Sequence, residues 1–272
     1  MGTILEVEDL QVREQASGRL LVADSSFSLS AGSCLAIVGE SGSGKSLTCR
    51  ALMRLRQPGL AQSGKIMLNG SEISGLPERE LNKLRGRRMC MIMQNGMRAF
   101  DPGSTLGRQL RAIAQRHYGW GRTDTDHRMR QALSAVGLSD PAAVLRSYAH
   151  ELSGGMLQRV MIAVALVLEP DVILADEPTT ALDAVVQYEV VQQLKKLRAR
   201  TGCAMIIVSH DLAVVRHLAD EMLVMKNGRI VESGETSQLF AHAKHPYTRE
   251  LIEAKEPLTL RFHQLLKGEG VC

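Results

Sequence analysis

The chain of 272 residues is long enough to bury one full hydrophobic core, or a core plus a small appended subdomain. Hydrophobic residues make up 44% and charged residues 23%, which excludes a disordered chain, and a net charge of +4 is too small to indicate a nucleic-acid-binding protein. The longest apolar run, Val160 to Leu168, is too short to cross a bilayer, which takes about 20 residues, so we expect a cytosolic chain.

The first third of the chain alternates strand, turn and helix patterns. Strand patterns occur at residues 4–12, 20–29, 33–38, 64–68 and 89–93. Residues 46–55 have helical spacing, and residues 81–88 predict a basic helix with a solvated face. Asn69-Gly70 follows a strand pattern and favours a hairpin turn.

Between the strand expected at 33–38 and the helix expected at 46–55 lies the pattern G-x-x-x-x-G-K-[ST], a phosphate-binding loop, or P-loop. Its glycines let successive backbone N–H groups point at phosphate oxygens. Lys45 is expected to reach the β- and γ-phosphates, and the Ser46 hydroxyl to bind Mg²⁺. A chance glycine-rich loop is disfavoured because all eight positions fit. These positions are Gly39, Glu40, Ser41, Gly42, Ser43, Gly44, Lys45 and Ser46.

The pattern changes after Gln94. Residues 95–149 lack strand signals and carry helical spacing at 106–114 and 128–136, which predicts an inserted helical subdomain. The alternation then returns. We expect helices ending at Leu168 and spanning Ala184 to Arg200, strands at 172–175 and 204–208, a β-rich stretch at 222–231, and a helical tail outside the core from Thr236.

Polar residues follow several of the expected strands. Gln94 follows one, Asp176 and Glu177 follow another, and His210 follows a third. Ligands of open parallel sheets bind beyond the carboxyl ends of the strands, so we expect these four residues to meet Lys45 and Ser46 around one nucleotide. Asp176 is placed to hold Mg²⁺ and Glu177 to polarise a water. Alternatively, the acids are surface groups and His210 caps the next helix.

A second anion site is predicted at Leu152 to Arg159, where Ser153, Gly154 and Gly155 precede a helix and leave N–H groups exposed at its N-terminus. The P-loop already serves one nucleotide. The simplest explanation of the second site is that it binds the nucleotide of a partner chain.

Together these motifs resemble the ATPase subunits of ABC transporters. Leu152 to Arg159 resembles their LSGGQ-type motif, Gln94 their Q-loop glutamine, Ala181-Leu182-Asp183 their D-loop and His210 their switch histidine. The resemblance implies an α/β fold with a RecA-like P-loop NTPase core, an antiparallel β subdomain and the inserted helical subdomain.

The resemblance also assigns further roles. It implies ATP and Mg²⁺, with Glu177, His210, Gln94 and Lys45 catalytic. It also implies nucleotide contacts for Leu47 and Arg13. Arg13 occupies the position where an aromatic residue usually stacks on adenine, and its guanidinium plane could stack there instead. The residues implied to hold Mg²⁺ are Ser46, Gln94 and Asp176. Those implied to bind the partner's nucleotide are Ser153, Gly154, Gly155, Gln158 and Asp183. The implied domains are a core of residues 1–94 and 152–235, a helical insert of 95–151 and a tail of 236–272.

Two segments, Tyr148 to Leu152 and His245 to Thr248, resemble the peptide/nickel importer branch, and Met93 to Asn95 resembles its nickel-import members. This implies uptake of nickel or a related transition metal, chelated forms included. The implied partners are two membrane-spanning permease subunits, a second, non-identical ATPase and a periplasmic or extracellular binding protein, with no nucleic acid. The chain would lie peripherally on the cytoplasmic face of the cell membrane. Alternatives are dipeptide or oligopeptide import and a soluble non-transport ATPase.

The C-terminal residues His242, His245, His263 and Cys272 suggest a metal site at first sight. Their spacing matches no ligand template, so a metal site is disfavoured here.

Overall fold

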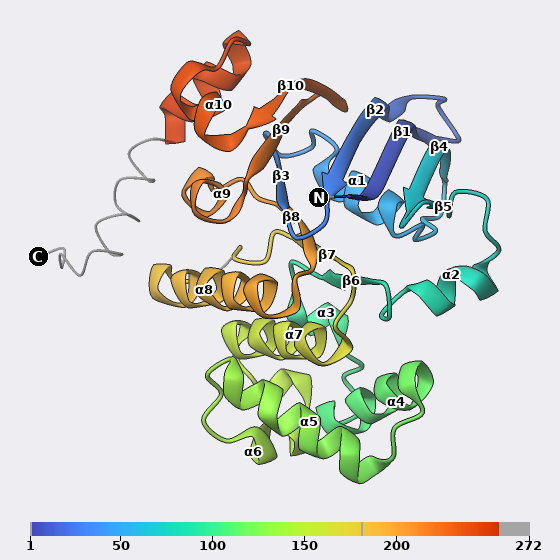
Figure 1. Cartoon of the computed structure of the whole chain (residues 1–272), viewed down its shortest axis with the longest axis vertical. Helices are drawn as coiled ribbons and strands as arrows, with labels where there is room; N and C mark the ends of the chain where they lie inside the picture. Colours follow the sequence, from blue (N-terminus) through green and yellow to red (C-terminus); the bar gives the residue numbers. More distant parts are fainter. Residues whose placement is uncertain (1, 181, 256–272) are drawn as a thin grey trace, which may run out of the picture. The chain divides into compact units, whose positions relative to one another are not determined.

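The computed structural model describes residues 2–180 and 182–255 (Figure 1). The described chain forms two compact units. Unit 1 contains the residues up to Asn82 and those from Ala204 on, and unit 2 is Lys83–Cys203. The domain boundaries expected from the sequence, at 94/95, 151/152 and 235/236, stay a prediction.

Unit 1 contains two groups of strands (Figure 1). An antiparallel sheet has the order β2 (Leu20–Ser30), β1 (Thr3–Glu14), β4 (Leu60–Leu68), β5 (Ser71–Glu72). The second group has the order β10 (Arg229–Glu235), β9 (Glu221–Lys226), β3 (Cys34–Val38), β8 (Ala204–Val208). In this group β9, β3 and β8 are parallel, whereas β10 is antiparallel to β9.

The strand patterns of unit 1 agree with this arrangement. All five residues of β3 and of β8 are buried, as continuous apolar runs in a parallel sheet should be. The predicted hairpin is confirmed, because Asn69 (φ 50°) and Gly70 (φ 73°) connect β4 to β5 in the left-handed conformation that such a turn requires.

The helices of unit 1 differ from the expectation mainly at their ends. α1 (Lys45–Leu52) stops short of the expected Leu55. The N–H of Arg54, at φ 53°, donates to the Ala51 carbonyl, and that of Leu55 to the Arg50 carbonyl. These two bonds form a Schellman cap, which ends the helix without the usual glycine.

The other helices that belong wholly or partly to unit 1 are short. α2 (Glu78–Leu84) crosses the boundary at Asn82, and it begins and ends earlier than expected. It does not reach residue 88 because Gly86 has φ 85° and cannot continue a helix. Two more are α9 (Leu212–Leu218) and α10 (Thr236–His242), and residues 246–255 are also helical.

The segment after Thr236 differs from the expected tail outside the core. Leu239, Tyr247 and Thr248 are buried, with Tyr247 4% exposed and Thr248 fully buried. The physical reason is that this segment makes contacts with β10 and the P-loop, which are distant in sequence. His263 and Cys272 lie outside the described residues.

Unit 2 combines a parallel strand pair with helices (Figure 1). The pair is β6 (Met89–Ile92) and β7 (Val172–Asp176). The predicted helical insertion is confirmed, and its helices are longer than their apolar stripes. The helical elements of the unit are α3 (Gly96–Ala99), α4 (Leu106–Tyr118), α5 (Arg122–Ala135), α6 (Pro141–Arg146), η1 (Ala149–Glu151), α7 (Gly154–Leu168) and α8 (Ala184–Thr201).

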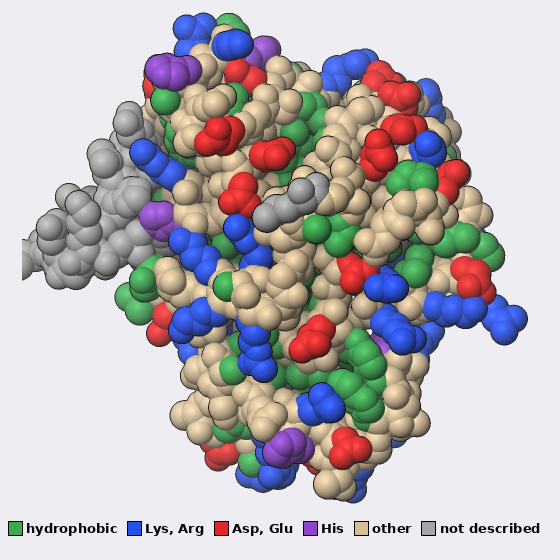
Figure 2. Space-filling view, viewed as in Figure 1, with side chains coloured by type: hydrophobic (Ala, Val, Ile, Leu, Met, Phe, Trp, Pro, Cys, Tyr) green, Lys and Arg blue, Asp and Glu red, His purple; other side chains and the backbone are tan. Residues whose placement is uncertain are grey.

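The surface is mixed in character. Figure 2 shows acidic and basic side chains interspersed on the visible face. Among the residues that the structure describes, the exposed large apolar side chains are Leu55, Met97, Tyr148 and Val185. Among the described helices, none has the length and apolar character to cross a membrane.

Candidate functional site

The P-loop of unit 1 connects β3 to α1 and needs glycine at two positions. Gly39 has φ 148°, and a Cβ there would lie 2.2 Å from the Met225 carbonyl oxygen. Gly44 has φ 102°, and its Cβ would lie 3.0 Å from the Leu21 carbonyl oxygen. A side chain at Gly39 would therefore collide with backbone, and one at Gly44 would be tightly packed against it in a backbone conformation that favours glycine, so the two glycines let the loop fit against β2 and β9.

Two polar side chains of the P-loop, Lys45 and Ser43, are buried. Lys45 is only 5% exposed, and its Nζ donates to the carbonyl oxygens of Gly39 (2.9 Å) and Glu40 (2.7 Å). Ser43 is 4% exposed, and within the described part of the chain its buried Oγ has no hydrogen-bond partner. An oxygen of a bound phosphate would satisfy that hydroxyl, so the loop fits a nucleotide.

The turn between β9 and β10 holds the P-loop from another side. The Gly228 N–H donates to the Ser43 carbonyl (3.1 Å), and the Ala23 N–H donates to the Gly228 carbonyl (2.8 Å). A Cβ on Gly228 would lie 2.5 Å from the Leu21 carbonyl oxygen. β2, the β9–β10 turn and the P-loop are thus packed backbone to backbone.

Two more sequence-predicted residues lie in unit 1. Arg13 is exposed on β1, where its Nη1 donates to the Gly18 carbonyl (2.9 Å), and its stacking on adenine stays a prediction. His210 follows β8 and is exposed. It does not cap the next helix, because the Asp211 carboxylate accepts the Ala213 N–H (2.8 Å) there.

In unit 2, Glu177 is held by two neighbours. Its Oε2 accepts a hydrogen bond from Gln94 Nε2 (3.0 Å) and one from Thr180 Oγ1 (2.8 Å). Glu177 also has φ 48°, which for a residue other than glycine costs about 1–3 kcal/mol and is typical of functional sites. Asp176, at the end of β7, is 3% exposed. Its carboxylate oxygens, like the Ser46 hydroxyl, are the hard donors that Mg²⁺ prefers.

The sequence analysis does not predict Thr180 as a residue of the site. The only local signal is its position three residues after Glu177, where the Thr180 N–H also donates to the Glu177 carbonyl (3.2 Å) in a turn. A threonine in a turn is common, and its contact with a carboxylate depends on the backbone of that turn.

Gln94 and Gln158 line the same cavity of about 380 Å³ in unit 2. Gln158 is 3% exposed, and within the described residues its Nε2 has no hydrogen-bond partner. Gly96 lets α3 approach α7 closely, since a Cβ there would lie 2.7 Å from Leu157 Cβ. The cavity therefore brings the residues after β6 next to α7.

The predicted second anion site lies at the start of α7. Ser153 is its N-cap, accepting the Met156 N–H (3.2 Å), and Gly154 is exposed at the first helical position. Asp183 is the N-cap of α8, and its carboxylate accepts the N–H groups of Val185 and Val186. Ser153 and Asp183 are therefore helix N-caps, and their contact with a partner's nucleotide stays a prediction.

The predicted residues thus fall into two sets. Unit 1 holds the P-loop, Arg13 and His210, and unit 2 holds Gln94, Asp176, Glu177 and the residues at the starts of α7 and α8. That both sets meet on one nucleotide stays a prediction. The part of the chain that the structure describes contains no group of three or more His, Cys, Asp or Glu residues able to hold a metal ion.

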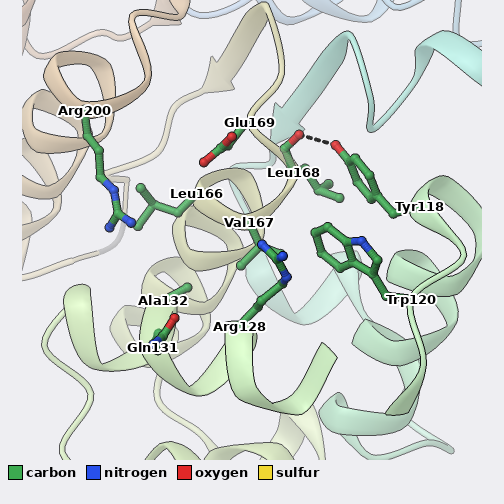
Figure 3. Close-up of a pocket in the computed structure, with 10 residues that line it drawn as sticks. All are labelled: Tyr118, Trp120, Arg128, Gln131, Ala132, Leu166, Val167, Leu168, Glu169 and Arg200. Atoms are coloured by element: carbon green, nitrogen blue, oxygen red, sulfur yellow. Dashed lines mark hydrogen bonds between the residues drawn. The ribbon is translucent and has the colours of Figure 1, made fainter. Parts of the chain in front are cut away.

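Another pocket of unit 2, shown in Figure 3, contains none of the predicted residues. Trp120 stacks on Tyr118 with ring centroids 4.5 Å apart, and the Arg128 guanidinium lies 4.4 Å from the Trp120 ring centroid. The Tyr118 hydroxyl donates to the Leu168 carbonyl. These groups satisfy one another and fix the helices around the pocket.

Comparison with known proteins places these features in one family. Residues 22–180 match the family model described as ABC transporter. The metal-staphylopine import system ATP-binding protein CntD of Staphylococcus aureus is 39% identical over 98% of both chains. The oligopeptide transport ATP-binding protein OppD of Haemophilus influenzae is 41% identical over 93% of this chain and 79% of its own. The dipeptide transport ATP-binding protein DppD of Bacillus subtilis is 37% identical over 99% and 82%.

Two solved structures are similar to the chain. The ATP-binding cassette MJ0796, a dimer bound to ADP and Pi, superposes with a TM-score of 0.76 at 24% identity, over 86% of this chain and 99% of its own. At that identity the likeness establishes the fold alone. The protein cbiO1 of Clostridium perfringens, part of the transporter complex cbiONQ, has a TM-score of 0.74 at 25% identity over 98% and 100%.

Proposed function

The chain belongs to the ABC transporter family, and from that premise we propose that it powers an importer of chelated transition metal, nickel included. It is an ABC-type ATPase. The observation that carries the proposed cargo is the match to the metal-staphylopine import protein over 98% of both chains. Peptide import is the second candidate, because the oligopeptide and dipeptide relatives reach similar identity.

We propose that unit 1 binds Mg·ATP through the P-loop. The N–H groups of the loop and the Lys45 ammonium contact the phosphates, while the Ser43 hydroxyl donates to a phosphate oxygen. Mg²⁺ neutralises phosphate charge when bound, and the Ser46 hydroxyl, Gln94 and Asp176 are the groups that would hold it. Lys45 then leaves the Gly39 and Glu40 carbonyls, on which it rests here, to reach the phosphates.

The hydrolytic step needs a group that orients the attacking water. We assign this to Glu177, whose carboxylate is fixed by Gln94 and Thr180 and can take a proton as the water attacks the γ-phosphorus. The P–O bond to the leaving ADP breaks as the new one forms. His210, at the carboxyl end of β8, is assigned to the γ-phosphate.

We propose that partner subunits complete the transporter. Gly154 and its neighbours at the start of α7 face a second, non-identical ATPase, for which the exposed Val185, 63% accessible, offers an apolar contact next to Asp183. Two permease subunits carry the cargo across the membrane, an external binding protein delivers it, and this chain lies on the cytoplasmic face. The name of the metal-staphylopine relative, an import system, supports this assembly.

The cargo is tested by uptake in cells that lack this chain, comparing labelled nickel, free and chelated, with a labelled dipeptide. We expect metal accumulation to fall and to be restored by the wild-type chain but not by Glu177→Gln. If metal uptake is unchanged while dipeptide uptake disappears, the metal proposal is wrong and the peptide alternative stands.

A further inference from the structure

Tyr247, in the C-terminal part of the described chain, contacts the P-loop directly. It is 4% exposed, and its hydroxyl oxygen accepts a hydrogen bond from the Glu40 N–H at 3.0 Å. The two residues are 207 positions apart in sequence and both belong to unit 1. A residue of the His245–Thr248 segment therefore reaches the backbone that is predicted to bind phosphate.

The Tyr247 ring is held in place from its other sides. The Lys226 ammonium lies 4.3 Å from the ring centroid, at the end of β9. The Tyr247 N–H donates to His245 Nδ1 (3.2 Å), and the Glu232 carboxylate of β10 accepts the N–H groups of Lys244 (2.7 Å) and His245 (3.2 Å). Contacts to both β9 and β10 thus fix the position of Tyr247, and with it the position of its hydroxyl.

The bonded peptide group also connects Tyr247 to Lys45. The Gly39 carbonyl and the Glu40 N–H are the two ends of one planar peptide group. Lys45 Nζ donates to the carbonyl end (2.9 Å), and the Tyr247 hydroxyl accepts from the N–H end. Rotation of this peptide group would break both hydrogen bonds. When Lys45 moves to the phosphates, as proposed above, the Tyr247 bond is the one of the two that continues to hold the peptide group.

We propose that Tyr247 is a positioning residue of the nucleotide site: its hydroxyl holds the Gly39–Glu40 peptide group in the phosphate-binding conformation, so the segment 244–248 sets the affinity of the P-loop. Without the hydroxyl, the loop populates other peptide orientations, and the apparent affinity falls with the fraction of competent loop. The inference depends on the P-loop as the nucleotide site and is independent of the imported cargo.

The test compares Tyr247→Phe with Tyr118→Phe in the full chain. Both changes delete one hydroxyl that bonds to backbone, but Tyr118 bonds to the Leu168 carbonyl in unit 2, away from the P-loop. We expect Tyr247→Phe to raise the dissociation constant for Mg·ATP about three- to tenfold, as the loss of one hydrogen bond allows. Tyr118→Phe should lower the unfolding temperature while leaving that constant unchanged.

Hydrogen exchange at the Glu40 amide, without nucleotide, provides a second readout. The amide should be protected in the wild type and in Tyr118→Phe, and should exchange faster in Tyr247→Phe. If Tyr247→Phe binds Mg·ATP within twofold of wild type, or if both variants weaken binding equally, the positioning role is wrong. If Tyr247→Phe does not fold, the wild-type amide still decides, because fast exchange there would overturn the contact.

Discussion

At the scale of single residues, Glu232 fixes the start of the segment that carries Tyr247. Burial acts to raise the pKa of this carboxyl, but hydrogen bonds to the carboxylate, including those from the Lys244 and His245 N–H groups, outweigh it and hold the pKa below its ordinary value of 4.5. A depressed pKa in the folded state means that the ionised carboxylate stabilises the fold.

That stabilisation has a defined pH range. It is complete above the ordinary pKa of 4.5 and is lost as the pH falls through the lower pKa of the folded chain. We therefore expect the unfolding temperature of Glu232→Gln to lie below that of the wild type at pH 6, and the difference to shrink as the pH falls below about 4. Thermal unfolding across this range measures it, with the exposed Glu72→Gln as control. A pH-independent difference would contradict the assignment.

The sequence identifies the residues of the P-loop and those that follow the strands, because their spacing in local patterns carries the chemistry. It does not identify Thr180 or Tyr247. Thr180 depends on the backbone turn at Glu177, and Tyr247 meets Glu40 across 207 residues of chain. The periodic patterns of a single sequence indicate helices and strands, but they do not indicate contacts between particular side chains such as these. Likewise, Asp211 and His210 are adjacent, and only the fold decides that Asp211 caps α9.

At the scale of elements, the close approach of α7 to α8 depends on one glycine. A Cβ on Gly155 would lie 2.7 Å from Val186 Cγ1, whereas a Cβ on Gly154 would meet nothing within 4 Å. Val186 is β-branched and has little rotamer freedom on a helix, so it cannot easily move aside. We expect Gly155→Ala to destabilise unit 2 by about 1–3 kcal/mol and Gly154→Ala to leave its stability unchanged or slightly higher.

Denaturation followed by tryptophan fluorescence measures this difference, because Trp120 is the single tryptophan of the chain and lies in unit 2. Equal stabilities of the two alanine variants would show that α8 can shift at no cost, and the close-packing explanation would then be wrong.

Elements were easier to predict than their ends. The buried strands β3, β7 and β8 are predicted correctly, because each contains a continuous apolar run in the sequence. The end of α1 is not predicted by the sequence, because Arg54 adopts the left-handed conformation that usually requires glycine after a helix. The sequence places the segment after Thr236 outside the core, whereas Leu239 and Tyr247 are buried there. Local patterns do not report this, because the partners of the segment lie far away in the sequence.

At the scale of the whole molecule, the motifs identify an ABC-type ATPase, and relatives that match most of its length are named as a metal-staphylopine import protein and a dipeptide transport protein. Local patterns give the family but not the cargo, because none of the motif residues contacts a transported molecule in the proposed mechanism. The two units hold complementary halves of the predicted chemistry. The P-loop lies in unit 1 and Glu177 in unit 2.

The central claim is that these halves act on the same nucleotide. It is tested most directly by measuring Mg·ATP affinity and turnover of Glu177→Gln, with Glu169→Gln as control, since Glu169 is an exposed glutamate with a similar left-handed φ of 44°. We predict that Glu177→Gln retains ATP affinity while turnover falls by about 10²–10⁴-fold, and that Glu169→Gln behaves as wild type. Turnover by Glu177→Gln within tenfold of wild type would contradict the claim.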